Sequence, residues 1–176
     1  LAVAGPAEEQ AAATPPHKFL HKTEMTYAEI FRTFYAEGFV PMMKQMAEAL
    51  GHDKLIALLQ DATAKASAQE VTEWAAKLPK HDLQTWVADF RNPNPFWQHV
   101  LTFQFVEDTP TAVEFKITEC LWAKTFRDAD AADIGYASIC YGDIAAAPAF
   151  NPKMKFTRSQ TLMQGQPYCN HRYVLE

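Results

Sequence analysis

The hydrophobic period of this chain changes at the segment Asn92-Pro-Asn-Pro95. Each proline disfavours helical geometry in the residue before it, so no helix is expected to continue through the segment. Upstream, from Tyr27 to Phe90, apolar residues recur at helical spacing. Downstream, the run from His99 to Glu107 alternates between apolar and polar faces, which is typical of a strand. The chain therefore needs a fold with a helical first half and a β-containing second half.

The first predicted helix begins after an N-cap at Thr26 or Thr23. Glu29 follows three residues after Thr26, and this spacing indicates a capping box. Gly38 and Pro41 are expected to interrupt the helix, because proline in a helix interior removes a hydrogen bond and clashes with the preceding turn. Beyond the interruption the helical spacing resumes and ends at Gly51, a residue type common after helix C-termini.

Further helices are predicted up to the period change. Residues 53–66 form one, and Ser67 to Leu78 form the next, with Ser67 and Glu70 as a second capping box. Pro79 breaks the pattern, and helical spacing resumes from His81 to Phe90.

The second half is predicted to contain two hairpins separated by a helix. The first hairpin pairs His99–Glu107 with Ala112–Ala123; the helix spans Ala129–Ala147 and stops at Pro148; the second hairpin pairs Lys153–Met163 with Gln166–Val174. The fold class is therefore α+β: an N-terminal helical half followed by a small antiparallel sheet, in the order β-β-α-β-β, packed on a helix.

The 176 residues fit one domain preceded by a leader. Residues 1–22 are rich in Ala and Pro and are interpreted as a flexible leader; residues 23–176 form the domain, with 23–91 as its helical half and 95–176 as the half carrying the site. The expected location is the cytoplasm. The alternative is export to the periplasm, with the Ala-rich leader as the remnant of a signal peptide.

Charge and hydropathy exclude several classes of partner. The net charge is −5, and positive residues form no cluster that would favour nucleic acid or an anionic membrane. No apolar run approaches the roughly 18 residues of a membrane span. A small-molecule substrate remains as the expected partner, and long amphipathic helices leave a homo-oligomer open.

Chemically versatile side chains gather in the last third of the chain. On the predicted helix, Tyr136, Cys140 and Asp143 are spaced to share one face. On the last predicted strand, Cys169 and His171 point to one side of the sheet. If the two surfaces meet, Cys140, Asp143, Cys169 and His171 converge, and we predict these four as the catalytic residues.

Two chemistries fit this set. A cysteine beside an imidazole can act as a thiolate nucleophile, with Asp143 orienting His171. Alternatively, Cys140, Cys169 and His171 can ligate a metal such as zinc, although no C-x-x-C motif is present. The alternative is a purely structural role, in which the buried cysteines and the histidine belong to the core. No cofactor is required by the sequence.

The predicted substrate-binding residues are Arg158, Tyr136 and Glu119. The Arg158 guanidinium has the geometry to hold a substrate carboxylate in two hydrogen bonds, and a surface ion pair is the alternative. Cys120 lies beside Glu119, and with an odd count of 3 cysteines at least one thiol stays free.

These residues also carry a family resemblance over about residues 95–176. That part of the chain resembles the L-2-amino-thiazoline-4-carboxylic acid hydrolases. The resembling motifs are Glu119-Cys-Leu-Trp122, Gly135-Tyr136, Cys140-Tyr-Gly-Asp143, Phe150-Asn-Pro152, Arg158, Leu162-Met-Gln-Gly165 and Cys169-Asn-His-Arg-Tyr173. The resemblance implies a hydrolase acting on a non-peptide C–N bond, with ring opening of a cyclic amidine such as a 2-amino-thiazoline carboxylate as the founding activity. The alternative function is a non-catalytic protein that binds a small ligand or a metal in the same Cys/Asp/His pocket.

Overall fold

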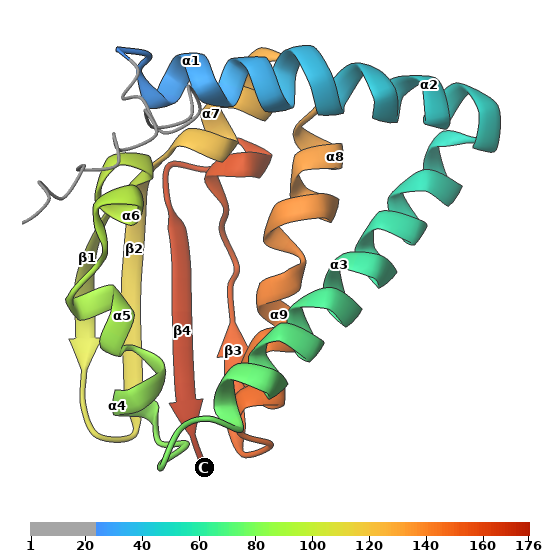
Figure 1. Ribbon diagram of the computed structural model, residues 1–176. Helices are drawn as coiled ribbons and strands as arrows, with labels where there is room; N and C mark the ends of the chain where they lie inside the picture. Colours follow the sequence, from blue (N-terminus) through green and yellow to red (C-terminus); the bar gives the residue numbers. More distant parts are fainter. Residues whose placement is uncertain (1–23) are drawn as a thin grey trace, which may run out of the picture.

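The computed structural model describes residues 24–176 and has an α+β fold, in which helices pack on a four-stranded antiparallel sheet (Figure 1). The strand order is β1-β2-β4-β3. The predicted fold class is confirmed. The predicted leader, residues 1–22, lies outside the described residues.

The first helix begins where the capping box predicts. In α1 (Tyr27–Phe31), the Glu29 backbone N–H donates to Thr26 Oγ1 over 3.2 Å, and the Thr26 N–H donates to the Glu29 carboxylate over 2.8 Å. Both donors would otherwise lack intrahelical partners, so the box fixes the start of the helix.

The predicted interruption at Gly38 and Pro41 is wrong. The helix passes through a π-helical segment, η2 (Arg32–Phe39), directly into α2 (Val40–Leu50). Pro41 stands in the first turn of α2, directly after the π-helical segment. Its missing N–H costs little hydrogen bonding at that position, so the chain continues as one long helical element. Figure 1 shows this element crossing one end of the molecule.

Gly51 ends α2 as predicted, with a backbone φ of 91°. The helices predicted at 53–66 and Ser67–Leu78 are instead one helix, α3 (His52–Ala75). Ser67 does not cap it, because the backbone remains helical there. Ser67 packs where α3 approaches the following helical layer: a Cβ on Gly142 would lie 3.0 Å from the Ser67 Cβ. The small side chain therefore serves close packing.

Three short helices connect α3 to the sheet. The helix predicted from His81 to Phe90 divides into α4 (Leu83–Trp86), capped by Asp82, and α5 (Ala88–Arg91). A third helix, α6 (Pro95–Val100), follows the Pro-rich break. It includes His99, which was predicted to start the strand; Asn94 caps α6 by accepting from the Trp97 N–H over 3.2 Å, and this cap explains the helix.

The sheet follows the predicted alternation with shorter strands. Its members are β1 (Leu101–Asp108), β2 (Ala112–Cys120), β3 (Met154–Thr157) and β4 (Cys169–Leu175). In the β2–β4 register, Phe115 pairs with His171 and Ile117 with Cys169. Alternate residues of both strands are buried against the helices, and the intervening residues face outward.

Both predicted hairpins extend too far. Cys120 ends β2, and the next residues form α7 (Leu121–Asp128), with Cys120 as N-cap. β3 stops at Thr157, and a 3₁₀ turn, η4 (Leu162–Gln164), precedes β4. In each case the side chain at the start of the turn, Cys120 or Thr161, accepts a hydrogen bond from a backbone N–H three residues later. This bond favours the beginning of a helix over continuation of the strand.

The helix predicted over Ala129–Ala147 has three parts: α8 (Ala132–Gly135), the π-helical η3 (Tyr136–Cys140) and α9 (Gly142–Phe150). Pro148 lies inside α9 and does not stop it. The Asn151 N–H still donates to the Ala147 carbonyl over 3.1 Å, which keeps the last turn closed.

Two core clusters hold these layers together. One lies between the sheet and the helices α3 and α9, with Phe115 and Phe150 among its members. The other lies beneath the long N-terminal helical element and contains Phe126 and Ile134. Within the described residues, no helix is long and apolar enough to cross a membrane.

Candidate functional site

A cavity of about 410 Å³ lies where α3, α5, α9 and the sheet approach one another. We call it the inner cavity. Its volume is within the roughly 300–1,000 Å³ of small-molecule sites. Its aromatic wall consists of Trp74, Trp86, Phe90, Trp97, Phe103 and Tyr173. Its charged lining residues are all acidic: Glu70, Asp89 and Asp143.

Asp143 is the carboxylate best placed for chemistry. It lies in the first turn of α9, and one of its oxygens, Oδ2, accepts from the Arg158 guanidinium. The Asp143 side chain is 36% exposed, whereas that of Arg158 is 3% exposed. Asp143 also lines a neighbouring hollow of about 270 Å³ beside α3. The arginine is thus the buried support, and the carboxylate faces open space.

Arg158 is fully engaged by its surroundings. Its Nη2 donates to the Cys140 carbonyl over 2.9 Å, in addition to the Asp143 ion pair. The guanidinium carbon lies 5.6 Å from the ring centroid of Tyr136 and 5.5 Å from that of Phe156, within the range of cation–π attraction. Arg158 therefore holds Asp143, and Tyr136 contacts the arginine and does not line the inner cavity; the predicted roles of both residues in substrate binding stay predictions.

Burial and the neighbouring charge shift the pKa of Asp143 in opposite directions. Burial among the side chains around α9 raises the pKa of this carboxyl above its usual value, and the Arg158 guanidinium pulls the pKa back down. Because the side chain retains 36% exposure, solvent also relieves part of the burial effect. A carboxyl with a raised pKa is better matched to general base catalysis near neutral pH.

The three cysteines surround this ion pair as free thiols. Burial raises the pKa of Cys120 to about 11, and burial also raises the pKa values of Cys140 and Cys169. Two of the thiols have local structural roles: Cys120 Sγ accepts from the Ala123 N–H, and Cys169 Sγ accepts from the Leu162 N–H over 3.2 Å. Protonated thiols are weak nucleophiles, so none of the three is activated in this state.

His171 is buried between aromatic rings. Its ring centroid lies 5.3 Å from that of Phe115 and 5.3 Å from that of Phe156. Burial lowers the pKa of His171 to about 3, with a smaller contribution from the Arg158 charge, so the imidazole is neutral at pH 7. Among the described residues no hydrogen bond joins His171 to a cysteine or to Asp143. The predicted catalytic roles of the thiols and of His171 stay predictions.

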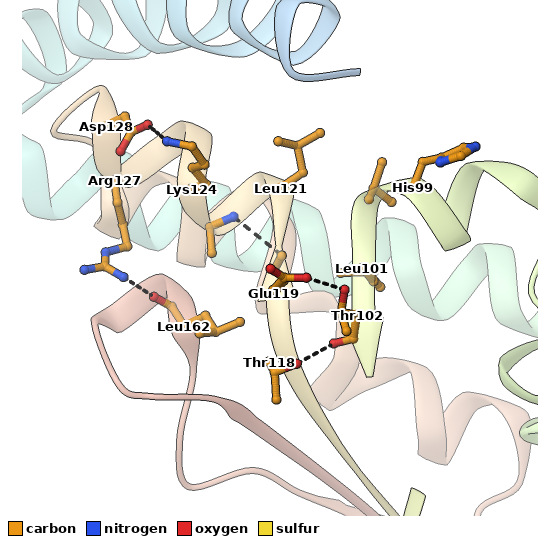
Figure 2. A pocket seen from close by; sticks show the side chains of 13 residues that line it. His99, Leu101, Thr102, Thr118, Glu119, Leu121, Lys124, Arg127, Asp128 and Leu162 are labelled. Carbon is orange, nitrogen blue, oxygen red and sulfur yellow. Dashed lines mark hydrogen bonds and ion pairs between the residues drawn. The ribbon is translucent and has the colours of Figure 1, made fainter. Parts of the chain in front are cut away.

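Glu119 faces a different hollow from Asp143. An outer groove of about 620 Å³ lies along α7 and the ends of β1 and β2 (Figure 2). There the Glu119 carboxylate accepts from the Thr102 hydroxyl over 2.5 Å, Lys124 pairs with Asp128, and Arg127 donates to the Leu162 carbonyl. Although this groove is the larger of the two, these four charged groups already have hydrogen-bond or ion-pair partners in its own wall. We therefore place the candidate site in the inner cavity.

The metal alternative lacks an assembled ligand set. In residues 24–176, no three side chains among His, Cys, Asp and Glu gather closely enough to hold a metal ion. Cys140, Cys169 and His171 lie around Arg158, whose positive charge disfavours a cation at that place.

Sequence reasoning missed the aromatic wall and two of its carboxylates. Glu70 and Trp74 are four residues apart on one helix, so helical spacing alone places them on one face. Trp86 and Asp89 come from two short helices that were predicted as one. These four residues meet Asp143 only through long-range packing, which cannot be predicted from the spacing of residues within one helix.

The fold and the cavity together define an α+β domain with a site of small-molecule size. The sequence model of the L-2-amino-thiazoline-4-carboxylic acid hydrolases matches residues 28–173, and the chain belongs to this family. No functionally curated protein matches the chain. Among solved structures, the phenol-responsive sensory domain of the transcription activator PoxR, determined with phenol, is similar in fold: the TM-score is 0.53 at 12% identity, over 81% of this chain and 75% of that one.

Proposed function

We propose that this protein is a hydrolase that cleaves a non-peptide C–N bond in a small cyclic amidine or amide bound in the inner cavity, with Asp143 as the general base. The proposal is carried by one observation: a carboxylate with accessible surface stands at the wall of an aromatic cavity and is fixed from behind by a buried arginine. Membership of a family named for a thiazoline hydrolase supports the reaction class.

The reaction needs one water and one carboxylate. Asp143 accepts a proton from water as the oxygen adds to the ring carbon between the two heteroatoms. The tetrahedral intermediate then collapses, the ring C–N bond breaks, and protonated Asp143 returns the proton to the leaving nitrogen. Overall, one substrate molecule and one water molecule give one ring-opened product, and Asp143 returns to its ionised form. A positioned general base contributes typically 10²–10⁴-fold to such a step.

Arg158 and the aromatic residues position this chemistry. Arg158 binds Oδ2 of Asp143, and no hydrogen bond from the described residues reaches Oδ1, so this oxygen is free to hold a water. Trp74 and Trp86 give the cavity wall aromatic surface that suits a planar ring. The thiol-nucleophile mechanism remains the competing version within this function, with Cys140 or Cys169 attacking the same carbon.

A turnover screen with matched variants tests the proposal. Purified protein is assayed against cyclic amidines and cyclic amides by mass detection of products that have gained one water. We expect Asp143→Asn to lose about 10²–10⁴-fold in kcat/KM on any substrate found. Asp61→Asn is the control, because it makes the same chemical change at an exposed position on α3. Full activity in Asp143→Asn would refute the base assignment, and loss in Cys140→Ser or Cys169→Ser alone would favour the thiol mechanism.

The second candidate is a binding protein without turnover. One observation favours it: apart from its three carboxylates, the inner cavity is lined by apolar and aromatic residues, and neither the cysteines nor His171 are among them. A binding protein would gain thermal stability with a ligand in proportion to ligand concentration. Stabilisation without product, for every compound that binds, would decide for this function.

A further inference from the structure

We infer that the inner cavity selects planar cations and rejects carboxylates, so that the substrate of this protein is an amidinium-type ring without an acidic substituent. This inference rests on the proposed use of the inner cavity and narrows the substrate class within it. It separates this chain from the compound in the family's name, which carries a carboxylate.

The first argument is the sign of the charges at the cavity wall. Glu70 and Asp89 are exposed at its lining and make no ion pair within residues 24–176. The Asp143–Arg158 pair is neutral as a whole, but only its carboxylate lines the cavity. No Lys or Arg lines the cavity. The field inside is therefore negative, and it attracts cations and repels anions.

The second argument is the shape and electronics of the wall. Trp74 and Trp86 lie with ring centroids 6.0 Å apart, and Trp86 lies 5.6 Å from Tyr173. Aromatic rings attract a cation through the negative charge of the π system, and tryptophan does so most strongly. A flat amidinium can stack on such a ring while its N–H groups reach a carboxylate.

The third argument is a buried donor at the same wall. The indole Nε1 of Trp86 has no hydrogen bond of good geometry among the described residues, although it lies near enough to the Tyr173 hydroxyl to lower the pKa of that group slightly against the effect of burial. Buried donors are seldom left unpaired. Because this N–H is enclosed behind the cavity surface, a ligand reaches it only where the Trp86–Tyr173 contact opens, and the ligand would then supply the missing acceptor.

The fourth argument concerns what is missing for an anion. The only cation beside Asp143 is Arg158, in the described part of the chain, and its side chain is 3% exposed and bound to Asp143 and to the Cys140 carbonyl. A substrate carboxylate in the cavity would meet acidic groups without a counter-charge. Such an uncompensated approach is unfavourable in a partly dehydrated site.

Three probes of equal size and different charge test the inference: benzamidinium, benzamide and benzoate. Binding is followed by tryptophan fluorescence and by calorimetry at low and high salt. We expect benzamidinium to bind about 10-fold or more tightly than benzamide, and benzoate to bind more weakly than benzamide. In the double variant Glu70→Gln/Asp89→Asn, about 2- to 10-fold of the cation preference should disappear, because exposed carboxylates contribute modestly. Asp61→Asn should retain the full preference.

The outcomes separate this inference from the proposed function. Benzoate binding as tightly as benzamidinium, or no binding of any probe, would overturn the inference. Cation preference in a protein that hydrolyses no cyclic amidine or amide would support the inference and refute the hydrolase. Turnover of a carboxylate-bearing ring, by a protein that binds the three probes equally well, would support the hydrolase and refute the inference.

Discussion

Replacing Arg158 with methionine tests the support of Asp143 directly. Methionine keeps an unbranched apolar stem between Tyr136 and Phe156 and removes only the charge and its donors. Loss of one partner of a buried ion pair destabilises proteins by about 3–5 kcal/mol. Because Asp143 is 36% exposed, solvent can rehydrate part of its charge, and the expected loss falls to about 2–3 kcal/mol. The lost hydrogen bond to the Cys140 carbonyl adds about 1 kcal/mol.

The assay is urea unfolding at pH 7, followed by circular dichroism, with Arg172→Met as the matched control. Arg172 also pairs with a glutamate, Glu107, but its side chain is 38% exposed on the outer face of the sheet, so its loss should cost less than about 1 kcal/mol. The double variant Asp143→Asn/Arg158→Met should be more stable than Arg158→Met alone, because it leaves no unpaired charge. Equal stability of the Arg158 and Arg172 variants would refute the reasoning.

The pH dependence of this effect has a definite sign. Burial raises the pKa of Asp143 above the ordinary 3.8, and loss of Arg158 raises it further. A carboxyl whose folded pKa is raised favours the folded state while it is protonated, and that contribution disappears as the pH rises through the folded pKa. The destabilisation by Arg158→Met should therefore be small near pH 3.8 and grow toward neutral pH.

Three further predictions concern the core and the thiols. Because the pKa of His171 is lowered to about 3 from 6.5, acid should destabilise the protein by up to about 1.4 kcal/mol per pH unit below 6.5, and His171→Gln should remove this slope in pH-dependent unfolding. Gly135→Ala should lower stability by about 1–3 kcal/mol, since its Cβ would lie 2.6 Å from the Phe126 ring, whereas Gly38→Ala meets only an ordinary 3.4 Å contact and should not. The three thiols should react with a disulfide reagent far more slowly in the native protein than in urea, because their pKa values are raised; fast labelling of one thiol at pH 7 would contradict this.

The sequence predicted the fold class because its strongest signals are local. The capping box at Thr26, the helix end at Gly51 and the alternation in the strands each depend on residues a few positions apart. The errors came where tertiary packing overrides a local signal. Pro41 follows a π-helical segment, and Ser67 lies where α3 needs a small side chain beside α9 rather than a cap.

The site was predicted in part for a similar reason. Helix and strand periods predict that Cys140, Asp143, Cys169 and His171 converge, and in the structure all four lie near the Arg158 guanidinium. Spacing cannot report burial depth, and it is burial that raises the thiol pKa values and lowers that of the imidazole. Nor can spacing report that the aromatic wall comes from four separate helices and two strands.

The arrangement of the ion pair argues for a role beyond stability. Where a buried pair serves packing alone, apolar residues of similar volume often replace it with no loss, because dehydrating two charges offsets their attraction. Here the two partners are buried unequally: Arg158 is enclosed, and Asp143 opens to the cavity. That asymmetry fixes one carboxylate oxygen and leaves the other available. The variant Asp143→Leu/Arg158→Met should accordingly stay folded with nearly native stability while losing ligand binding and turnover together. If it folds and keeps both native turnover and native binding of benzamidinium, the ion pair is only a packing element, and the assignment of Asp143 as the base is refuted.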